Sequence, residues 1–292
     1  MLFLTLLALA APQPGQQATI DVSAATLWTS PKAPRAIDAP ALGNPVDLDA
    51  WNRNLASTSA RAGLDGRVVT QALYGEKVVV LAVRGRWAKV AVPDQPSPLD
   101  RHGYPGWLPL RQLVTGYNRS GHRLTVVTRK ATLHLGSRKL VLSYGTRLPV
   151  TGETPTTWRV RTPDGPGWIL RSKFAKPPSL TGANVVAEAK RFLGLRYLWG
   201  GTSAWGFDCS GLVWDVFHAL GKTVPRDTGP QSHAGKPVTG ALRPGDLVLY
   251  GSPATHVAIV AGNGMMIESP DSAHSVRLVP LRSGYSVARR YA

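Results

Sequence analysis

The sequence is poor in cysteine and in acidic residues. Its 292 residues include one cysteine, Cys209, so the chain can form no internal disulfide and offers no paired cysteines for a zinc site. Lys and Arg number 34 against 17 Asp and Glu, a net charge of +17. The length permits about two domains. The lone thiol is therefore of interest for its reactivity and not for crosslinking.

Long hydrophobic runs are also lacking. The candidate targeting segment, residues 2–11, is apolar apart from Thr5 and is too short to span a bilayer, which takes about 20 residues. Ala8 and Ala10 fit a secretory cleavage site, although no basic residue precedes the run. We expect residues 1–18 to be a signal-like segment and linker, with no transmembrane segment and with export to the periplasm, cell wall or exterior. A frayed apolar terminus is the alternative.

The positive charge is concentrated in the middle of the chain. Between Arg119 and Lys176 there are 12 Lys and Arg residues, against only Glu153 and Asp164. Such a local field favours a polyanionic partner. No helix-turn-helix, zinc finger or RNP-like motif is present to read bases, so we expect no nucleic acid. For an exported protein, the partner would be an anionic wall polymer or membrane headgroups. The alternative is that these residues only solvate a surface.

A sequence unit occurs twice in the first two thirds of the chain. The segments YGEKVVV (74–80), WAKV (87–90) and GYPGWL (103–108) recur as YGTRLPV (144–150), WRV (158–160) and GPGWI (165–169). Short β-branched runs between Gly and Pro turns predict small all-β barrels. Both copies resemble bacterial SH3 domains. We expect one such domain over residues 19–116, with an insertion near residues 93–104, and a basic one over residues 117–178.

The pattern changes after a Pro-rich linker near residue 178, where residues 179–292 form the third expected domain. Apolar residues recur at helical spacing from Val185 to Phe192 and again from Cys209 to Leu220. The spacing therefore puts Cys209 at the N-terminus of a helix, where the helix dipole favours an anionic thiolate. A buried inert cysteine is the usual alternative. The small residues around this thiol leave backbone N–H groups free for a substrate oxygen, which favours catalysis.

A thiolate hydrolase also needs a base, and His256 is the best candidate among seven histidines. His218 lies nine residues after Cys209, on the opposite face of the same helix. His233 lies in a polar segment, and three other histidines belong to the β-rich repeats. His256 opens an apolar strand after a turn and another strand, 243–250, so hairpin pairing would hold it in a fixed position.

These residues carry a second resemblance. The segments YLWGG (197–201), DCSG (208–211), RPGDL (243–247) and HVAI (256–259) resemble the NlpC/P60 family of cell-wall cysteine peptidases. The resemblance implies a papain-like α+β domain, catalytic Cys209 and His256, and no metal or cofactor. Family members most often have a histidine as the third residue, where this chain has Glu268. A carboxylate can accept the imidazole N–H and hold its tautomer.

The whole chain resembles a narrower group, the γ-D-glutamyl-L-diamino-acid endopeptidases with two SH3-like modules. In that group the first module closes one end of the cleft and binds a free N-terminal L-Ala through an acidic residue and a tyrosine, here Glu76 and Tyr104. The alternative for Glu76 is a solvated turn residue. The resemblance implies further substrate-binding residues, namely Tyr197, Asp208, Ser210, Asp227 and Thr228.

We therefore expect an exported thiol peptidase whose partners are peptidoglycan-derived peptides. It would hydrolyse the bond between γ-D-Glu and a diamino acid by acyl-enzyme chemistry. One rival is a broader hydrolase that acts on intact peptidoglycan. The other is a wall-binding protein with a decayed catalytic domain, which the unusual Glu268 favours.

Overall fold

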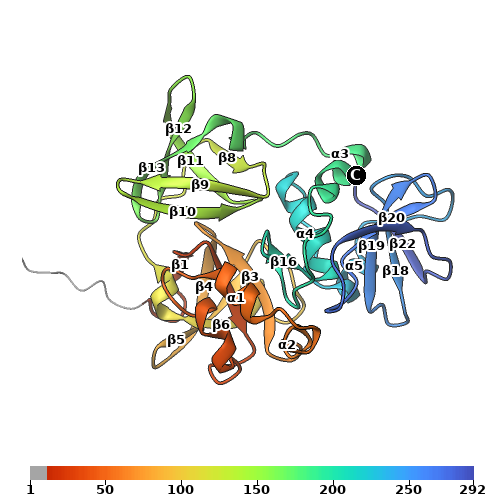
Figure 1. Cartoon of the computed structure of the whole chain (residues 1–292), viewed down its shortest axis with the longest axis horizontal. Coiled ribbons are helices and arrows are strands. Elements are labelled where there is room, and N and C mark those ends of the chain that lie inside the picture. The colour runs from red at the N-terminus through yellow and green to blue at the C-terminus, as the bar shows by residue number, and fades with distance from the viewer. Residues whose placement is uncertain (1–11) are drawn as a thin grey trace, which may run out of the picture.

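The computed structural model describes residues 12–292, in three modules (Figure 1). The apolar run at residues 2–11 lies outside the described residues. Two antiparallel barrels are followed by a module of helices and a six-stranded sheet. No helix within residues 12–292 is long and apolar enough to cross a membrane.

The first module is a seven-stranded sheet closed around an apolar core. Its order is β3-β2-β6-β5-β4-β1-β7, and all its pairings are antiparallel. Ile20, Val80, Val90 and Leu108 are fully buried in this core. The first strand begins at Gln17, two residues before the expected start of the module. The strands are β1 (Gln17–Ile20), β2 (Ala24–Trp28), β3 (Val68–Leu73), β4 (Lys77–Arg84), β5 (Trp87–Val92), β6 (Tyr104–Pro109) and β7 (Leu113–Val114), with η2 (Leu110–Gln112) before β7.

A helical excursion between β2 and β3 interrupts this otherwise all-β module. It consists of η1 (Ala36–Ala41), α1 (Leu48–Asn54) and α2 (Thr58–Ala62). Asp47 caps α1 and Ser57 caps α2 through side-chain oxygens that accept backbone N–H groups. Trp51 is fully buried, and its indole N–H donates to Asp38 at 2.8 Å. The sequence pattern indicated strands alone here, so this excursion was not predicted.

The second module repeats the strand order of the first. Its order, β10-β9-β13-β12-β11-β8-β14, matches that of the first module when seven is subtracted from each strand number. The repeat seen in the sequence is therefore a repeat of structure, and the expectation of two SH3-like barrels is confirmed. The strands are β8 (Arg123–Val126), β9 (Lys130–Leu135), β10 (Arg138–Ser143), β11 (Arg147–Glu153), β12 (Thr157–Thr162), β13 (Gly165–Leu170) and β14 (Phe174–Ala175), with η3 (Arg171–Lys173) before β14.

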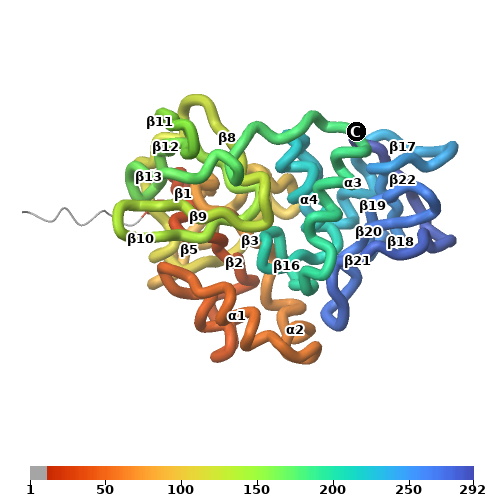
Figure 2. The backbone as a smooth tube through the Cα atoms, turned by 45° about the horizontal axis from the view of Figure 1, so that its top comes forward, coloured from red at the N-terminus to blue at the C-terminus, as the bar shows by residue number. Residues whose placement is uncertain are grey.

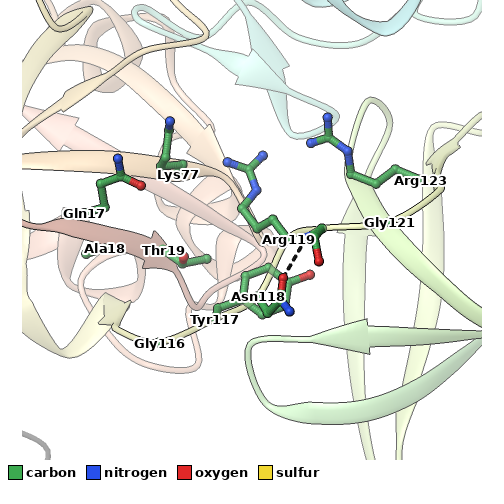
Figure 3. A pocket seen from close by; sticks show the side chains of 11 residues that line it. Gln17, Ala18, Thr19, Lys77, Gly116, Tyr117, Asn118, Arg119, Gly121 and Arg123 are labelled. Carbon is green, nitrogen blue, oxygen red and sulfur yellow. Dashed lines mark hydrogen bonds between the residues drawn. The ribbon is translucent and has the colours of Figure 1, made fainter.

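The two barrels are joined by the short segment 115–122 (Figure 3). Gly116 and Gly121 adopt φ values of 77° and 105°, in the left-handed region that favours glycine. Between them, the Asn118 side chain accepts the backbone N–H of Ser120 at 2.9 Å. The Tyr117 hydroxyl donates to the Arg161 carbonyl at 3.0 Å, which anchors the linker to the second barrel.

The third module packs helices against a sheet of order β17-β22-β18-β19-β20-β21. Helix α4 lies against β19, and Phe192, Phe207 and Phe217 are buried in the shared core. The mixed α+β class is confirmed. Its elements are α3 (Gly182–Lys190), β15 (Thr202–Ser203), β16 (Gly206–Phe207), α4 (Cys209–Ala219), α5 (Thr228–His233), β17 (Lys236–Pro237), β18 (Leu247–Tyr250), β19 (His256–Gly262), β20 (Met265–Glu268), β21 (Arg277–Pro280) and β22 (Val287–Arg290).

The hairpin β15–β16 docks the third module onto both barrels (Figure 2). The backbone N–H of Thr202 donates to Gln71 of the first barrel at 3.2 Å, and that of Ala204 donates to Ser143 of the second at 2.9 Å. All of these groups are buried. The hairpin leads directly into α4, so both barrels help to position the start of that helix.

Candidate active site

The thiol of Cys209 lies at the first residue of α4 and is half-buried. Asp208 is the N-cap, and its Oδ1 accepts the backbone N–H of Gly211 at 2.6 Å. A Cβ on Gly211 would lie 2.0 Å from the carbonyl oxygen of Gly201, so only glycine allows the preceding loop to approach the helix so closely. The sulfur lies 3.6 Å from the hydroxyl of Thr228 at the start of α5.

His256 opens β19, where it pairs with Tyr250 across the β18–β19 hairpin. Its Nε2 lies 2.7 Å from Oε2 of Glu268. Burial alone would lower the pKa of His256, but hydrogen bonds with Cys209 and Glu268 outweigh burial and raise the pKa to about 9. The imidazole is therefore protonated at neutral pH, and a protonated imidazole beside a thiol favours the thiolate. The structure brings these three side chains together.

Glu268, the last residue of β20, is a buried and ionised carboxylate. Arg277 donates to its Oε1 from Nε at 3.0 Å and from Nη2 at 2.8 Å. Arg282 donates to its Oε2 at 2.8 Å. Burial would raise the pKa of Glu268, but the hydrogen bonds from His256 and Arg277 lower it to about 2. The side chain thus holds the imidazole, and two arginines that the sequence reasoning missed keep the carboxylate ionised.

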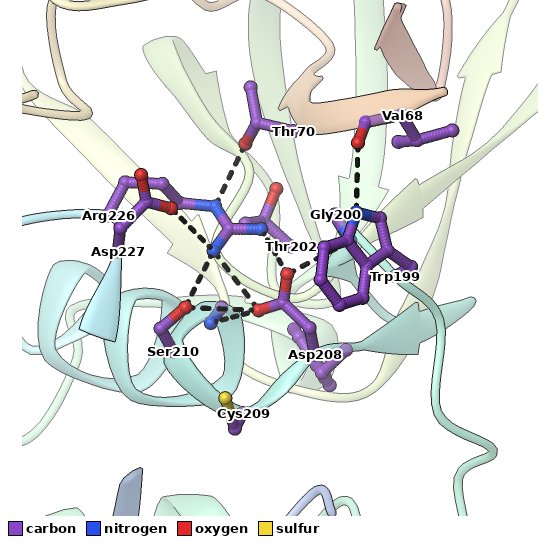
Figure 4. A network of polar contacts seen from close by, with 12 residues as sticks. Val68, Thr70, Trp199, Gly200, Thr202, Asp208, Cys209, Ser210, Arg226 and Asp227 are labelled. Atoms are coloured by element: carbon purple, nitrogen blue, oxygen red, sulfur yellow. Dashed lines mark hydrogen bonds and ion pairs between the residues drawn. The ribbon is translucent and has the colours of Figure 1, made fainter. Parts of the chain in front are cut away.

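A fully buried arginine organises the wall next to the thiol (Figure 4). Arg226 donates to Asp208 Oδ2 at 2.7 Å, to the Ser210 hydroxyl at 3.0 Å and to Thr70 of the first barrel at 3.0 Å. The other donor to Asp208 Oδ2 is the backbone N–H of Gly200, at 2.9 Å. Burial would lower the pKa of Arg226, but the Asp208 carboxylate outweighs burial and raises it. Asp208 and Ser210 therefore hold this wall together as well as facing the cleft.

The catalytic cleft has a volume of about 510 Å³ and is lined from both sides of the thiol. All five predicted residues of the third module line it, namely Tyr197, Asp208, Ser210, Asp227 and Thr228. Asp65 and Asp271 add carboxylates that were not predicted. No Lys or Arg among residues 12–292 lines the cleft. The cleft is therefore acidic in an otherwise basic protein.

The two predicted residues of the first module have different positions. Tyr104 reaches the cleft wall, where its hydroxyl donates to Asp227 Oδ2 at 2.9 Å. Glu76 does not line the cleft, and it is not a solvated turn residue either. It is buried at the β3–β4 turn, where its Oε2 accepts the backbone N–H of Leu73 at 3.0 Å. The placement expected for Glu76 was wrong, because its side chain caps its own turn.

Asp65 is the first-module carboxylate that does line the cleft. It follows α2 in the helical excursion and is exposed. The excursion is fixed to the third module by Arg61, which donates to the Tyr197 carbonyl at 2.8 Å, and by Asn52, which donates to the Trp205 carbonyl at 2.8 Å. Sequence reasoning missed Asp65 because it did not predict the helices that deliver it.

The families matched by this chain agree with the three modules. Residues 194–291 match the NlpC/P60 family, residues 60–113 match the bacterial dipeptidyl-peptidase SH3 domain, and residues 126–175 match the YKFC SH3b2 domain. The chain is 38% identical to a gamma-D-glutamyl-L-lysine dipeptidyl-peptidase of Bacillus cereus, over 94% of this chain and 91% of the relative. It is 36% identical to a protein of the same name from Bacillus subtilis, over 90% and 93%.

A solved structure shares the whole architecture. The crystal structure of an NlpC/P60 family protein from Bacillus cereus superposes with a TM-score of 0.89 at 37% identity, and covers 94% of this chain and 99% of that one. A thiol at a helix N-terminus, hydrogen-bonded to an imidazole that a buried carboxylate holds, defines a cysteine peptidase. The chain belongs to the NlpC/P60 family, with two bacterial SH3 domains preceding the peptidase domain. The alternative of a decayed catalytic domain finds no support, since Glu268 is part of the assembled site.

Proposed function

We propose that this peptidase hydrolyses the amide bond between γ-D-glutamate and a diamino acid in peptidoglycan stem peptides that have a free N-terminal L-Ala. The observation that carries the proposal is the contact of Tyr104 with Asp227, by which the first SH3-like module meets the wall of the catalytic cleft. The two curated relatives bear the name of a γ-D-glutamyl-L-lysine dipeptidyl-peptidase. A cleft capped in this way fits a short peptide end better than a continuous polymer.

The charges of the cleft support a substrate with a free ammonium group. Asp65 and Asp227 are carboxylates at the first-module end, and no Lys or Arg of the described residues lines the cleft to compete for them. Arg226 lies 3.8 Å from Asp227, so it neutralises that carboxylate only in part. A charge-assisted hydrogen bond between ammonium and carboxylate is among the strong polar contacts in proteins. Asp65 thus replaces Glu76 in the proposed subsite.

The proposed reaction begins from a Cys209 thiolate beside a protonated His256 imidazole. The Cys209 thiolate attacks the γ-carbonyl carbon, and N–H groups of the first helical turn, which have no intrahelical acceptors, stabilise the oxyanion. His256 gives its proton to the leaving amine as the C–N bond breaks, which leaves a thioester. His256 then takes a proton from water, whose oxygen attacks the thioester, and the thiolate leaves to restore the pair.

The test compares L-Ala-γ-D-Glu-L-Lys with its N-acetylated form and with intact sacculi, and identifies products by mass spectrometry. We expect release of L-Ala-γ-D-Glu from the free peptide alone. Cys209→Ala should abolish this release while the unfolding temperature stays close to that of the wild type. Equal cleavage of the acetylated peptide and of sacculi would instead establish the broader hydrolase. A parallel peptide with meso-diaminopimelate in place of lysine determines the preferred diamino acid.

We also propose that the protein is exported and that its positive second module meets an anionic wall polymer. Export is supported by the apolar segment at residues 2–11 and by the proposed substrate, a component of the cell wall. N-terminal sequencing of protein recovered from the periplasm or culture medium tests it, and an intact Met1 in the cytosol alone would contradict it. The binding of an anionic partner is supported by the charge between Arg119 and Lys176.

A further inference from the structure

A second cleft lies where the two SH3-like barrels meet (Figure 3). This junction cleft is lined by residues 17–19 of β1, Lys77 at the start of β4, linker residues 116–121 and Arg123 at the start of β8. Its volume is about 660 Å³, larger than that of the catalytic cleft. It shares no lining residue with the catalytic cleft, so it is a separate place on the molecule.

Three cations from three separate segments converge on the junction cleft. Lys77, Arg119 and Arg123 all line it, and in Figure 3 their charged ends lie on the same side of the hollow. No Asp or Glu lines this cleft, and within the described chain none of the three cations is in an ion pair. Like charges gathered in a cleft whose lining holds no counter-ion repel one another, and a bound anion would relieve that repulsion.

Several other arginines of the second barrel have partners outside the junction cleft. Arg138 pairs with Asp164, and Arg171 donates to Glu153 at 2.9 Å. Arg129 donates to the backbone of the third module instead. What distinguishes the three junction cations from exposed lysines such as Lys139 and Lys173 is that they line one cleft together.

The linker holds the junction cleft in one shape. Arg161 on β12 donates to the carbonyls of Asn118 and Ser120 at 3.4 and 3.3 Å. This adds a fourth positive charge next to the lining without filling the hollow. The side-chain amides of Gln17 and Asn118 also line the cleft and offer neutral N–H donors. The backbone of a site held in this way loses little conformational freedom when it binds a ligand.

We propose that the junction cleft binds the phosphodiester groups of an anionic wall polymer. The proposal specifies where the partner suggested above would bind, and it does not depend on the peptidase reaction. Guanidinium groups match phosphate oxygens in a bidentate fork, and the lysine adds a compact charge. A phosphodiester chain has one charge per repeat, so consecutive repeats can meet Lys77, Arg119 and Arg123. A phospholipid headgroup presents the same chemistry from a different source.

The first arm of the test measures binding of a fluorescent oligo(glycerol phosphate) to the full chain by polarisation. The cleft variant is K77Q/R119Q/R123Q. The matched control is K139Q/K173Q/K176Q, which removes three charges from exposed lysines of the second barrel that do not line the cleft. We expect the cleft variant to weaken binding by at least about tenfold and the control by about twofold or less. The dependence of log Kd on log salt should become shallower by about two in the cleft variant alone.

The second arm uses vesicles of phosphatidylglycerol, with phosphatidylcholine vesicles as the reference. Loss of oligomer binding in the cleft variant assigns the polymer. If the cleft variant lost vesicle binding but kept oligomer binding, the ligand would be a lipid headgroup, and the wall-polymer assignment would be overturned. Equal losses in the two triple variants, or no binding of either probe by the wild type, would overturn the site itself. Hydrolysis of the free tripeptide on the same samples should be unchanged, which shows that the variants are folded and keeps this test separate from that of the peptidase.

Discussion

Glu268 and His256 form a buried pair in which the carboxylate Oε2 lies 2.7 Å from the imidazole Nε2. Because Nε2 is committed to the carboxylate, Nδ1 is the nitrogen that remains for Cys209. The pair therefore determines both the tautomer and the orientation of the ring. A carboxylate in this position does what a neutral third residue cannot, because its negative charge also stabilises the imidazolium. We therefore propose that Glu268, at a position where family members more often have histidine, serves as the third residue of the site.

Glu268→Gln tests this role. We expect kcat to fall by about 10- to 100-fold, because the neutral amide still accepts a hydrogen bond but no longer stabilises the imidazolium, while the thiolate keeps its intrinsic reactivity. The raised pKa of His256, about 9 in the wild type, should fall. Since the imidazolium is lost above its pKa, the alkaline limb of the kcat/KM profile should move to lower pH. A pH profile identical to that of the wild type would contradict the assignment.

The two arginines on Glu268 should act through it. Arg277→Gln and Arg282→Gln each remove a cation that lowers the Glu268 pKa, so that pKa should rise from about 2 towards its ordinary value. A carboxylate whose pKa is lowered in the folded state stabilises the fold at pH values above its ordinary pKa. This stabilisation is lost as the pH falls through the lowered pKa. Urea unfolding should therefore show a deficit in the variants at pH 7 that shrinks towards pH 2. Arg289→Gln, which touches Ser232 instead, is the control and should show no such pH dependence.

Arg226 should be needed for stability as well as for the shape of the cleft. It is fully buried against Asp208 and bridges to Thr70 of the first barrel. Arg226→Gln leaves Asp208 without its counter-ion, and breaking a buried pair in this way costs about 3 to 5 kcal/mol. The free energy of unfolding in urea measures this cost. Asp208→Asn is the reciprocal variant, and the double variant should lose less than the sum of the two, since the partners act together.

Much of the architecture could be predicted because it rests on local signals. The repeated Tyr-Gly and Gly-Trp segments correspond to two barrels with the same strand order, and Cys209 begins its helix as the spacing predicts. The three short helices between β2 and β3, one of which contains Trp51, were missed. They are only five to seven residues long, too short for periodicity to distinguish them from loops, although Asp47 and Ser57 are ordinary N-cap residues.

The less predictable part of the site depends on pairing between distant segments. Arg277 meets Glu268 only because β20 and β21 pair in one register, and nothing local in the sequence indicates that register. A different reason explains the error at Glu76. The family resemblance implied that an acidic residue of the first module meets the substrate, and Glu76 was the acidic residue in the matching stretch, whereas its carboxylate accepts the Leu73 N–H. Local chemistry was enough to single out Cys209 and His256 as the candidate nucleophile and base, whereas pairing between distant segments determines which charged side chains surround them.

Glu76 should be a source of alkaline instability. Burial and the nearby Asp94 carboxylate raise its pKa to about 8. For an acid with a raised pKa in the folded state, ionisation is penalised, so stability falls as pH rises from about 4.5 to about 8. Glu76→Gln removes this titration, and the variant should match the wild type at pH 4 and exceed it in unfolding temperature at pH 9. An identical pH dependence in both proteins would show that Glu76 is solvated.

Asp65 should contribute to specificity where Glu76 does not. If Asp65 binds the ammonium of L-Ala, deleting this charge-assisted contact costs about 1.5 to 3 kcal/mol, so Asp65→Asn should lower kcat/KM on the free tripeptide by about one to two decades. Acetylating the substrate removes the same contact, so it should penalise the wild type strongly and the variant little. Glu76→Gln is the matched control, since it also removes a first-module carboxylate but one outside the cleft, and its kcat/KM should stay within about twofold of the wild type. The reverse result, with Glu76→Gln impaired and Asp65→Asn normal, would return the ammonium subsite to the residue first expected from the sequence.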